Sequence, residues 1–137
     1  MTRISMAALA AVLVAAAATT CAQAATPSPA DIVNRHMAAA SAANIDALIG
    51  DYADDAVVLQ AGQATQGKTA IRAIFVGLFG GEQKLTITPT KVWQEGDVGF
   101  VSWTANGGAL AGQDSFLVKN GKIEVQAVWI GGPPPAQ

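Results

Sequence analysis

The sequence of 137 residues contains only one cysteine, one histidine and one tyrosine, and aromatic residues make up 6% of the chain. A single cysteine excludes an internal disulfide framework, so the core must be held by packing alone. One histidine, with the one cysteine close to the N-terminus, provides no cluster of transition-metal ligands. We therefore predict no metal site.

Charge is also scarce, because 13% of the residues are charged and the formal net charge is −2. The basic residues are scattered, whereas a nucleic-acid-binding protein typically shows a basic stripe with interleaved aromatic residues. We predict no nucleic-acid partner. Gly67-Lys68-Thr69 is similar to the end of a phosphate-binding loop but lacks the upstream glycine spacing, so we also predict no cofactor.

Residues 1–24 have the pattern of an export signal. Arg3 precedes an apolar run over residues 6–18, and Ala22-Gln23-Ala24 is a small-x-small cleavage site. The run is shorter than the roughly 20 apolar residues that a membrane-spanning helix needs. We predict a signal peptide cleaved near Ala24, a secreted or periplasmic protein, and no stable membrane span after cleavage. A lipid-modified Cys21 is the alternative, although the residues before it do not form the usual leucine-containing lipoprotein motif.

Helices are predicted in the first half of the chain. Ser28-Pro29-Ala30-Asp31 offers an N-cap serine, a proline at the first helical position and an acid at the third, so a helix should begin there. Apolar residues then recur at intervals of three and four, which places His36 on the buried face. Two further helices are predicted over residues 45–52, ended by Asp54-Asp55, and over residues 69–79, ended by Gly80-Gly81.

Strands follow in the second half. Alternating and β-branched residues predict strands over residues 56–61, 84–95, 98–105, 113–119 and 122–130. Asn120-Gly121 is a strong type I′ hairpin signal between the last two. We predict a loop over residues 62–67, a loop or bulged strand edge over residues 106–112, and a proline-rich tail over residues 131–137 that cannot join a sheet.

This order favours an α+β domain over residues 25–130, with about three N-terminal helices on one face of a curved, mainly antiparallel sheet. The other face must be solvated or buried against a second subunit. Val101, Trp103, Leu117 and the odd-numbered positions of the strand predicted over residues 122–130 could supply apolar area for such a homodimer.

Strand alternation places two polar side chains among apolar ones. Gln60 shares a face with Val58 at the end of its strand, and Asp114 has the same parity as Phe116 and Val118. If that face is the inner one, Asp114 carries a carboxyl group into apolar surroundings. Burial raises the pKa of an acid, and a nearby cationic imidazole lowers it.

Four segments, Asn44 to Leu48, Tyr52 to Val58, Gly67 to Arg72 and Asp114 to Ile123, resemble the nuclear transport factor 2-like superfamily of cone-shaped α+β domains. The resemblance covers residues 32–130 and indicates the SnoaL-like and ketosteroid-isomerase-like branch. The superfamily includes isomerases, dehydratases, cyclases, epoxide hydrolases and non-catalytic binding or dimerisation modules, so the fold alone does not choose a reaction.

The resemblance also implies positions for a site. The oxyanion tyrosine of ketosteroid isomerase falls on His36, its general-base aspartate on Gln60, and its oxyanion aspartic acid on Asp114. A glutamine cannot carry a proton between carbon atoms, so steroid isomerisation by that route is disfavoured. If His36 and Asp114 meet across a cavity, they can act as acid and base in a dehydration or hydration, which is lyase-type or isomerase-type chemistry.

Each candidate also has a plainer interpretation. His36 could be a buried histidine satisfied by a neighbour, and Asp114 a strand-entry aspartate bonded to backbone amides. Gln60 would hold a ligand carbonyl or hydroxyl group rather than take part in proton transfer. The candidate substrate-contacting aromatic residues are Trp103, Trp129 and Phe116, with core or dimer packing as their default role.

Two function classes follow. The first is an exported domain that binds a small hydrophobic, polyketide-like or steroid-like molecule, with or without catalysis. The second is a non-catalytic dimerisation or interaction module whose core is closed. An open pocket that reaches His36 and Asp114 would favour the first, and a collapsed core around His36 the second.

Overall fold

The computed structural model describes residues 24–82 and 84–131, so the predicted signal peptide and tail lie outside these ranges apart from Ala24 and Gly131. In chain order the elements are α1 (Pro29–Ser41), α2 (Ile45–Gly50), β1 (Tyr52–Gln60), β2 (Gln63–Gln66), α3 (Lys68–Phe79), β3 (Ile87–Glu95), β4 (Val98–Ala105), the 3₁₀ helix η1 (Asn106–Gly108), β5 (Leu110–Lys119) and β6 (Lys122–Gly131). No helix in the described ranges is long and apolar enough to cross a membrane.

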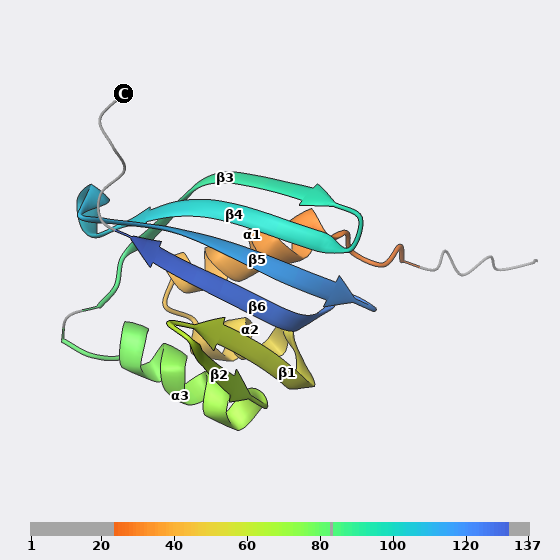
Figure 1. The fold of residues 1–137 in the computed structure, drawn as a ribbon, viewed down its shortest axis with the longest axis horizontal. Coiled ribbons are helices and arrows are strands. Elements are labelled where there is room, and N and C mark those ends of the chain that lie inside the picture. The colour runs from red at the N-terminus through yellow and green to blue at the C-terminus, as the bar shows by residue number, and fades with distance from the viewer. Residues whose placement is uncertain (1–23, 83, 132–137) are drawn as a thin grey trace, which may run out of the picture.

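The strands form one six-stranded sheet in the order β2-β1-β6-β5-β4-β3 (Figure 1). The β1–β6 pair is parallel and the other neighbouring pairs are antiparallel, so the sheet is mixed. Helix α1 packs against β3, β4 and β5, α3 packs against β1 and β2, and α2 contacts both of these helices. The predicted α+β class is confirmed.

Local signals at the start of α1 fix its position on the sheet. The Ser28 side chain accepts a hydrogen bond from the Asp31 backbone, and the Asp31 carboxylate accepts one from the Ser28 backbone, which confirms the predicted capping box. The predicted inward face, which includes His36, is buried. Gly99 on β4 permits close packing, because a Cβ there would lie 2.6 Å from Cγ2 of Val33. Helix α1 therefore lies directly on the backbone of β4.

The predicted boundary between the second helix and the first strand is wrong. Helix α2 ends at Gly50, and β1 already begins at Tyr52, whose side chain is fully buried. Asp54 and Asp55 do not end a helix but are exposed strand residues, in a stretch where the register between β1 and β6 shifts. Glycine disfavours helix continuation, and burial of Tyr52 determines where the strand starts.

Three glycine-rich or polar segments were predicted as loops or as a tail and are partly strand. Residues 63–66 form β2, joined to β1 by a turn in which Ala61 and Gly62 both have positive φ, 49° and 77°. Strand β5 begins at Leu110, and β6 extends to Gly131. Backbone pairing defines these strands: β2 pairs with β1 across a two-residue turn, Leu110 pairs with Ala105, and Gly131 pairs with Ala111. The local composition, rich in glycine and glutamine, does not reveal this pairing. Conversely, β3 begins only at Ile87, three residues later than predicted.

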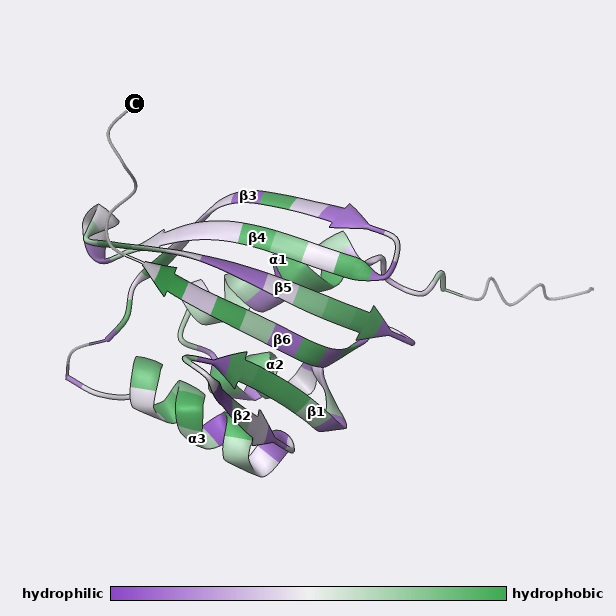
Figure 2. Cartoon of the chain, viewed as in Figure 1, coloured by the Kyte–Doolittle hydropathy of each residue, from purple (hydrophilic) through white to green (hydrophobic). Residues whose placement is uncertain are grey.

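Hydrophobic residues recur along the strands of the sheet (Figure 2), and successive residues of a strand point to opposite faces. Val101 and Trp103 lie in the core at 0% and 3% exposure, so the prediction that they belong to the free face is wrong. The face away from the helices carries a stacked pair, Trp93 on Phe100, and Trp129, which is 61% exposed. The outer face therefore carries large exposed aromatic side chains beside polar residues such as Ser102 and Gln113.

Candidate functional site

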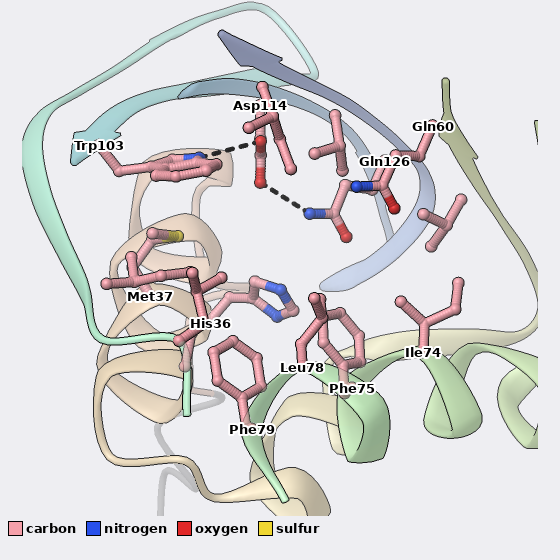
Figure 3. Close-up of a pocket in the computed structure, with 16 residues that line it drawn as sticks. His36, Met37, Gln60, Ile74, Phe75, Leu78, Phe79, Trp103, Asp114 and Gln126 are labelled. Atoms are coloured by element: carbon pink, nitrogen blue, oxygen red, sulfur yellow. Dashed lines mark hydrogen bonds between the residues drawn. The ribbon is translucent and has the colours of Figure 1, made fainter. Parts of the chain in front are cut away.

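A cavity of about 50 Å³ lies between the helices and the inner face of the sheet. Its buried floor comes from α1, α3 and the central strands, and includes His36, Met37, Phe75, Phe79, Trp103, Asp114 and Gln126 (Figure 3). Its half-buried or exposed rim consists of Gln60, Ile74, Leu78, Leu85, Val128 and Ile130. The walls are therefore mainly apolar, with polar groups concentrated on the floor.

Sheet register brings the polar residues together. Gln60 pairs with Val128, and Val128 pairs with Asp114, so these three residues form one row across β1, β6 and β5. Neighbouring strands lie roughly 4.8 Å apart, which places the Gln60 and Asp114 backbones roughly 10 Å from each other. Gln126 lies on the same face one row away, diagonal to Asp114.

Asp114 is 8% exposed and both of its carboxyl oxygens accept hydrogen bonds. Trp103 Nε1 donates to Oδ1 at 3.1 Å, and Gln126 Nε2 donates to Oδ2 at 2.8 Å. Burial raises the pKa of Asp114, and the two hydrogen bonds and the charge of His36 counter part of that rise. Asp114 is thus the carboxyl group on this floor that retains its proton more readily than a free acid.

His36 is 2% exposed and is oriented by a second carboxylate. Its Nδ1 lies 3.4 Å from Oδ2 of Asp51, and Arg35 donates from Nε to Oδ1 of the same carboxylate at 2.6 Å. Burial alone would raise the pKa of Asp51, but the hydrogen bonds and charges of His36 and Arg35 outweigh it and hold that pKa below its usual value. Asp51 is therefore an anion that faces the imidazole.

Tyr52 connects the two halves of the floor. Its hydroxyl group donates to Gln126 Oε1 and lies 3.5 Å from Nε2 of His36. Burial, together with the charges of Asp114 and Asp51, raises the pKa of Tyr52 well above its usual value, so the hydroxyl group keeps its proton. The result is one continuous polar chain, in the order Arg35, Asp51, His36, Tyr52, Gln126, Asp114 and Trp103.

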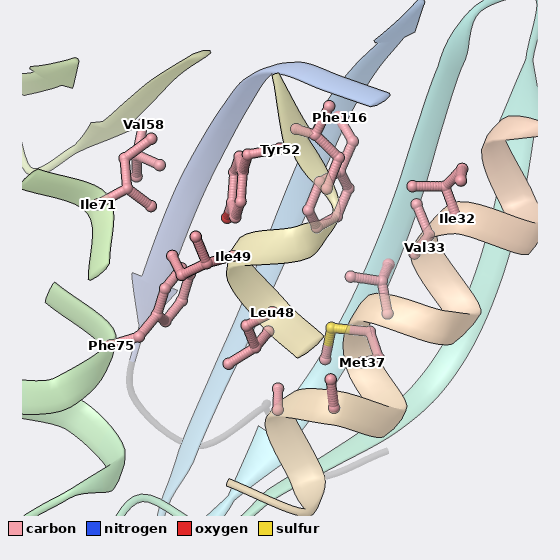
Figure 4. Close-up of a cluster of buried hydrophobic side chains, with 14 of the residues drawn as sticks. Ile32, Val33, Met37, Leu48, Ile49, Tyr52, Val58, Ile71, Phe75 and Phe116 are labelled. Carbon is pink, nitrogen blue, oxygen red and sulfur yellow. The ribbon is translucent and has the colours of Figure 1, made fainter. Parts of the chain in front are cut away.

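The six predicted site residues occupy different places. His36, Asp114, Gln60 and Trp103 all line the cavity. His36 and Asp114 are not hydrogen-bonded to each other, because Tyr52 and Gln126 stand between them. Phe116 is fully buried in the core cluster shown in Figure 4, where it packs edge-on against His36 with ring centroids 5.4 Å apart. Phe116 thus supports the imidazole and does not line the cavity.

Trp129 was predicted to contact a substrate but does not line the cavity. It lies on the outer face of the sheet, and strand alternation explains this, because its neighbours Val128 and Ile130 are the residues that line the cavity. The prediction of Trp129 as a cavity wall is therefore corrected.

Sequence reasoning missed four members of the polar chain: Arg35, Asp51, Tyr52 and Gln126. Tyr52 stood at the end of the helix predicted over residues 45–52, where nothing indicated a role in the site. The available signal for Gln126 was its parity with Val128 on an alternating strand, which puts an uncharged polar side chain on the inner face. Within residues 24–82 and 84–131, no group of three or more histidine, cysteine, aspartate or glutamate side chains is placed to hold a metal ion.

Solved structures share this architecture. An NTF-2 like protein of unknown function from Burkholderia xenovorans is 19% identical, with a TM-score of 0.66, over 77% of this chain and 84% of that one. A candidate ketosteroid isomerase from Kribbella flavida is 14% identical, with a TM-score of 0.66, over 77% and 81%. A candidate polyketide cyclase from Sinorhizobium meliloti is 28% identical, with a TM-score of 0.61, over 72% and 94%. The first two similarities concern the fold alone.

The fold is that of the nuclear transport factor 2-like superfamily. The family model for the SnoaL-like domain matches residues 33–126, and the chain belongs to that family. No curated protein matches the sequence.

Proposed function

We propose that the protein binds a small, mainly apolar molecule with an oxygen function in the cavity, and that His36 exchanges a proton with it. The observation that carries this proposal is the convergence of an oriented imidazole and a buried carboxyl group on the floor of one apolar cavity. Apolar walls with a few convergent polar groups are typical of small-molecule sites.

The two polar groups suit different roles. Asp51 holds Nδ1 of His36, which leaves Nε2 as the ring nitrogen for proton exchange. Asp114, with its raised pKa, is the group suited to donate a hydrogen bond to a ligand oxygen. Gln60 on the rim contacts a second polar group of the ligand. A base and an acid on opposite sides of one ligand support proton transfer of the lyase or isomerase type. Steroid isomerisation is disfavoured, because an amide stands at Gln60.

Cavity volume limits the ligand. The volume of about 50 Å³ is well below the roughly 150 Å³ of an engineered cavity that binds benzene. We therefore propose that the oxygen-bearing end of the ligand enters the cavity and that the rest lies across the rim formed by Ile74, Leu78, Leu85 and Ile130. The rim then limits the part of the ligand that stays outside the cavity, and we propose that it holds one ring and not a fused multi-ring compound.

A cavity-filling variant tests the proposal. Ala40 lines the cavity on α1, whereas Ala38 is exposed on the same helix. Ala40→Val should abolish binding of a neutral one-ring ketone such as cyclohex-2-enone, measured by calorimetry. Ala38→Val adds the same β-branched side chain to the helix and should leave binding unchanged. Equal binding by both variants would refute the assignment of the cavity.

The small volume also favours one other function class. A cavity this size is below the roughly 300 Å³ at which ligand pockets commonly begin, as expected for a non-catalytic interaction module with a nearly closed core. Absence of binding in the wild-type chain, together with an unchanged fold of Ala40→Val, would support that alternative.

We propose further that the protein is exported, as residues 1–24 suggest, and forms a homodimer through the outer face of the sheet. The support is the exposed aromatic side chains on that face, where Trp93 is 38% and Trp129 61% exposed. Trp129→Glu should reduce the mass measured by analytical ultracentrifugation to that of a monomer without unfolding the domain. A monomeric wild-type chain would exclude the dimer.

A further inference from the structure

The imidazole tautomer is set at one end of the polar chain. Nδ1 of His36 faces Oδ2 of the anionic Asp51 at 3.4 Å, and within the described ranges neither atom has a hydrogen-bond partner. When the ring is neutral, its single proton therefore belongs on Nδ1, and Nε2 carries a lone pair. This lone pair is the one that the proposed proton exchange needs.

The hydroxyl group of Tyr52 competes for that lone pair. It has one proton and two acceptors within reach, Oε1 of Gln126 and Nε2 of His36. The contact to Gln126 is the shorter, and the distance to His36 is 3.5 Å, at the limit of hydrogen bonding. The proton thus points towards Gln126.

Asp114 fixes the direction of the Gln126 amide. Gln126 donates from its NH₂ group to Oδ2 of Asp114 at 2.8 Å, so its carbonyl oxygen faces Tyr52. Oδ2 can accept this bond whether the carboxyl group is ionised or donates its own proton to a ligand. Trp103 occupies the other carboxylate oxygen as a second donor. Every hydrogen bond from Tyr52 to Asp114 therefore points away from His36.

We propose that Tyr52 and Gln126 are positioning residues that turn the tyrosine proton away from His36, and thereby keep the Nε2 lone pair available to a ligand in the cavity. This proposal rests on the proposed function in one respect only, which is that a bound ligand would use the Nε2 lone pair. The proposal is tested by NMR of the ligand-free protein. A failure of ligand binding can therefore be distinguished from a failure of this hydrogen-bond arrangement.

The first test removes the acceptor. In Gln126→Leu the Tyr52 proton loses its nearer partner and turns to His36. Because His36 is the only histidine, the untagged, ¹⁵N-labelled chain gives one pair of imidazole nitrogen signals. At about pH 9 an ordinary imidazole is neutral. In wild type we expect the ¹⁵N chemical shift of Nε2 to be that of a ring nitrogen whose lone pair accepts no hydrogen bond. In Gln126→Leu this signal should shift to lower frequency. The double variant Gln126→Leu/Tyr52→Phe should return the signal to the wild-type position.

The second test reverses the direction of the hydrogen bonds between Tyr52 and residue 114 without removing a polar side chain. The Trp103 indole can only donate, so in Asp114→Asn the amide oxygen stays with Trp103 and the NH₂ group lies where Gln126 now finds an acceptor. The amide of Gln126 then turns over and donates to Tyr52, whose proton moves to His36, so the Nε2 signal should shift as in Gln126→Leu. Gln113→Leu, which changes an exposed glutamine on the same strand, should leave the signal unchanged.

The results that overturn the proposal are equally specific. They are an Nε2 signal that stays in place in both Gln126→Leu and Asp114→Asn, or one that fails to return in the double variant. A proton on Nε2 in the neutral wild-type ring would also overturn it. Should Gln126→Leu fail to fold, Asp114→Asn decides the question alone, because it retains a polar side chain of the same shape.

Discussion

Trp103 and Gly112 are paired across β4 and β5, and the indole occupies the space where a side chain at residue 112 would begin. A Cβ on Gly112 would lie 2.2 Å from Cζ2 of Trp103, well inside van der Waals contact. The absence of a side chain at residue 112 allows the indole to lie across β5, where its Nε1 reaches Asp114 at 3.1 Å. A glycine that looks like a loop residue in the sequence therefore helps to build the cavity floor.

Gly112→Ala should displace the Trp103 indole and destabilise the fold by about 1–3 kcal/mol, the usual effect of overpacking a core. Urea denaturation followed by tryptophan fluorescence measures this loss. Gly50→Ala is the matched control, because a Cβ there meets nothing within 4 Å, and its effect should be neutral or slightly stabilising. Equal stability of Gly112→Ala and wild type would contradict the packing described.

Trp103→Phe should raise the pKa of Asp114 further. The indole hydrogen bond stabilises the ionised carboxylate and so opposes the rise caused by burial, and phenylalanine cannot donate it. Carbon-13 NMR of the carboxyl group across a pH series measures the change. Trp129→Phe, on the outer face, should leave that titration unchanged, and a similar shift in both variants would argue against a specific role for the Trp103 bond.

Asp51→Asn should destabilise the protein by about 1–3 kcal/mol at neutral pH, because the partners His36 and Arg35 lose a buried carboxylate. The folded-state pKa of Asp51 lies below its usual value of 3.8, so the carboxylate stabilises the fold above that value. That contribution is lost as the pH falls through the lowered folded-state pKa. The stability difference between wild type and variant should therefore shrink on acidification.

Thermal unfolding at several pH values checks this dependence. Asp55→Asn is the control, because Asp55 is exposed on β1, and it should match wild type. A difference for Asp51→Asn that grows towards acidic pH would have the wrong sign for a carboxylate with a lowered pKa.

Leu78→Ala should widen the rim of the cavity and admit a two-ring ketone such as tetralone, which wild type excludes. Leu78 is half-buried on α3, so its truncation should destabilise the fold by about 1–3 kcal/mol. This loss is smaller than that for a fully buried leucine. Calorimetric titration compares the two proteins. Val76→Ala truncates a residue that is 50% exposed on the same helix and should not admit the larger ketone. Binding of tetralone by wild type would show that the rim does not limit ligand size.

Local signals account for the parts of the fold that were predicted correctly. The capping box at Ser28 and the Asn120-Gly121 turn depend on neighbouring residues, and Asn120 and Gly121 have the positive φ values of 51° and 72° that a type I′ turn needs. The inward placement of His36 followed from helical periodicity alone. Strand parity placed Asp114 on the same face as Phe116 and Val118 but did not decide which face is the inner one. These features require no knowledge of distant contacts.

The polar chain could not be predicted in the same way. Tyr52 meets Gln126 because β1 pairs in parallel with β6, across a register shift between Tyr52 and Val57. Asp51 reaches His36 because α2 ends at Gly50 and the chain turns directly into the sheet. Contacts of this kind join residues that are far apart in sequence, and strand pairing, which composition does not encode, determines them.

The central claim is that the cavity beside His36 binds a small oxygen-bearing molecule, and NMR titration of wild type with cyclohex-2-enone tests it most directly. We expect the imidazole signals of His36 and the indole signal of Trp103 to move together and saturate, while the indole signal of Trp129 on the outer face stays in place. Signals of His36 and Trp103 that never move, or movement confined to Trp129, would contradict the claim.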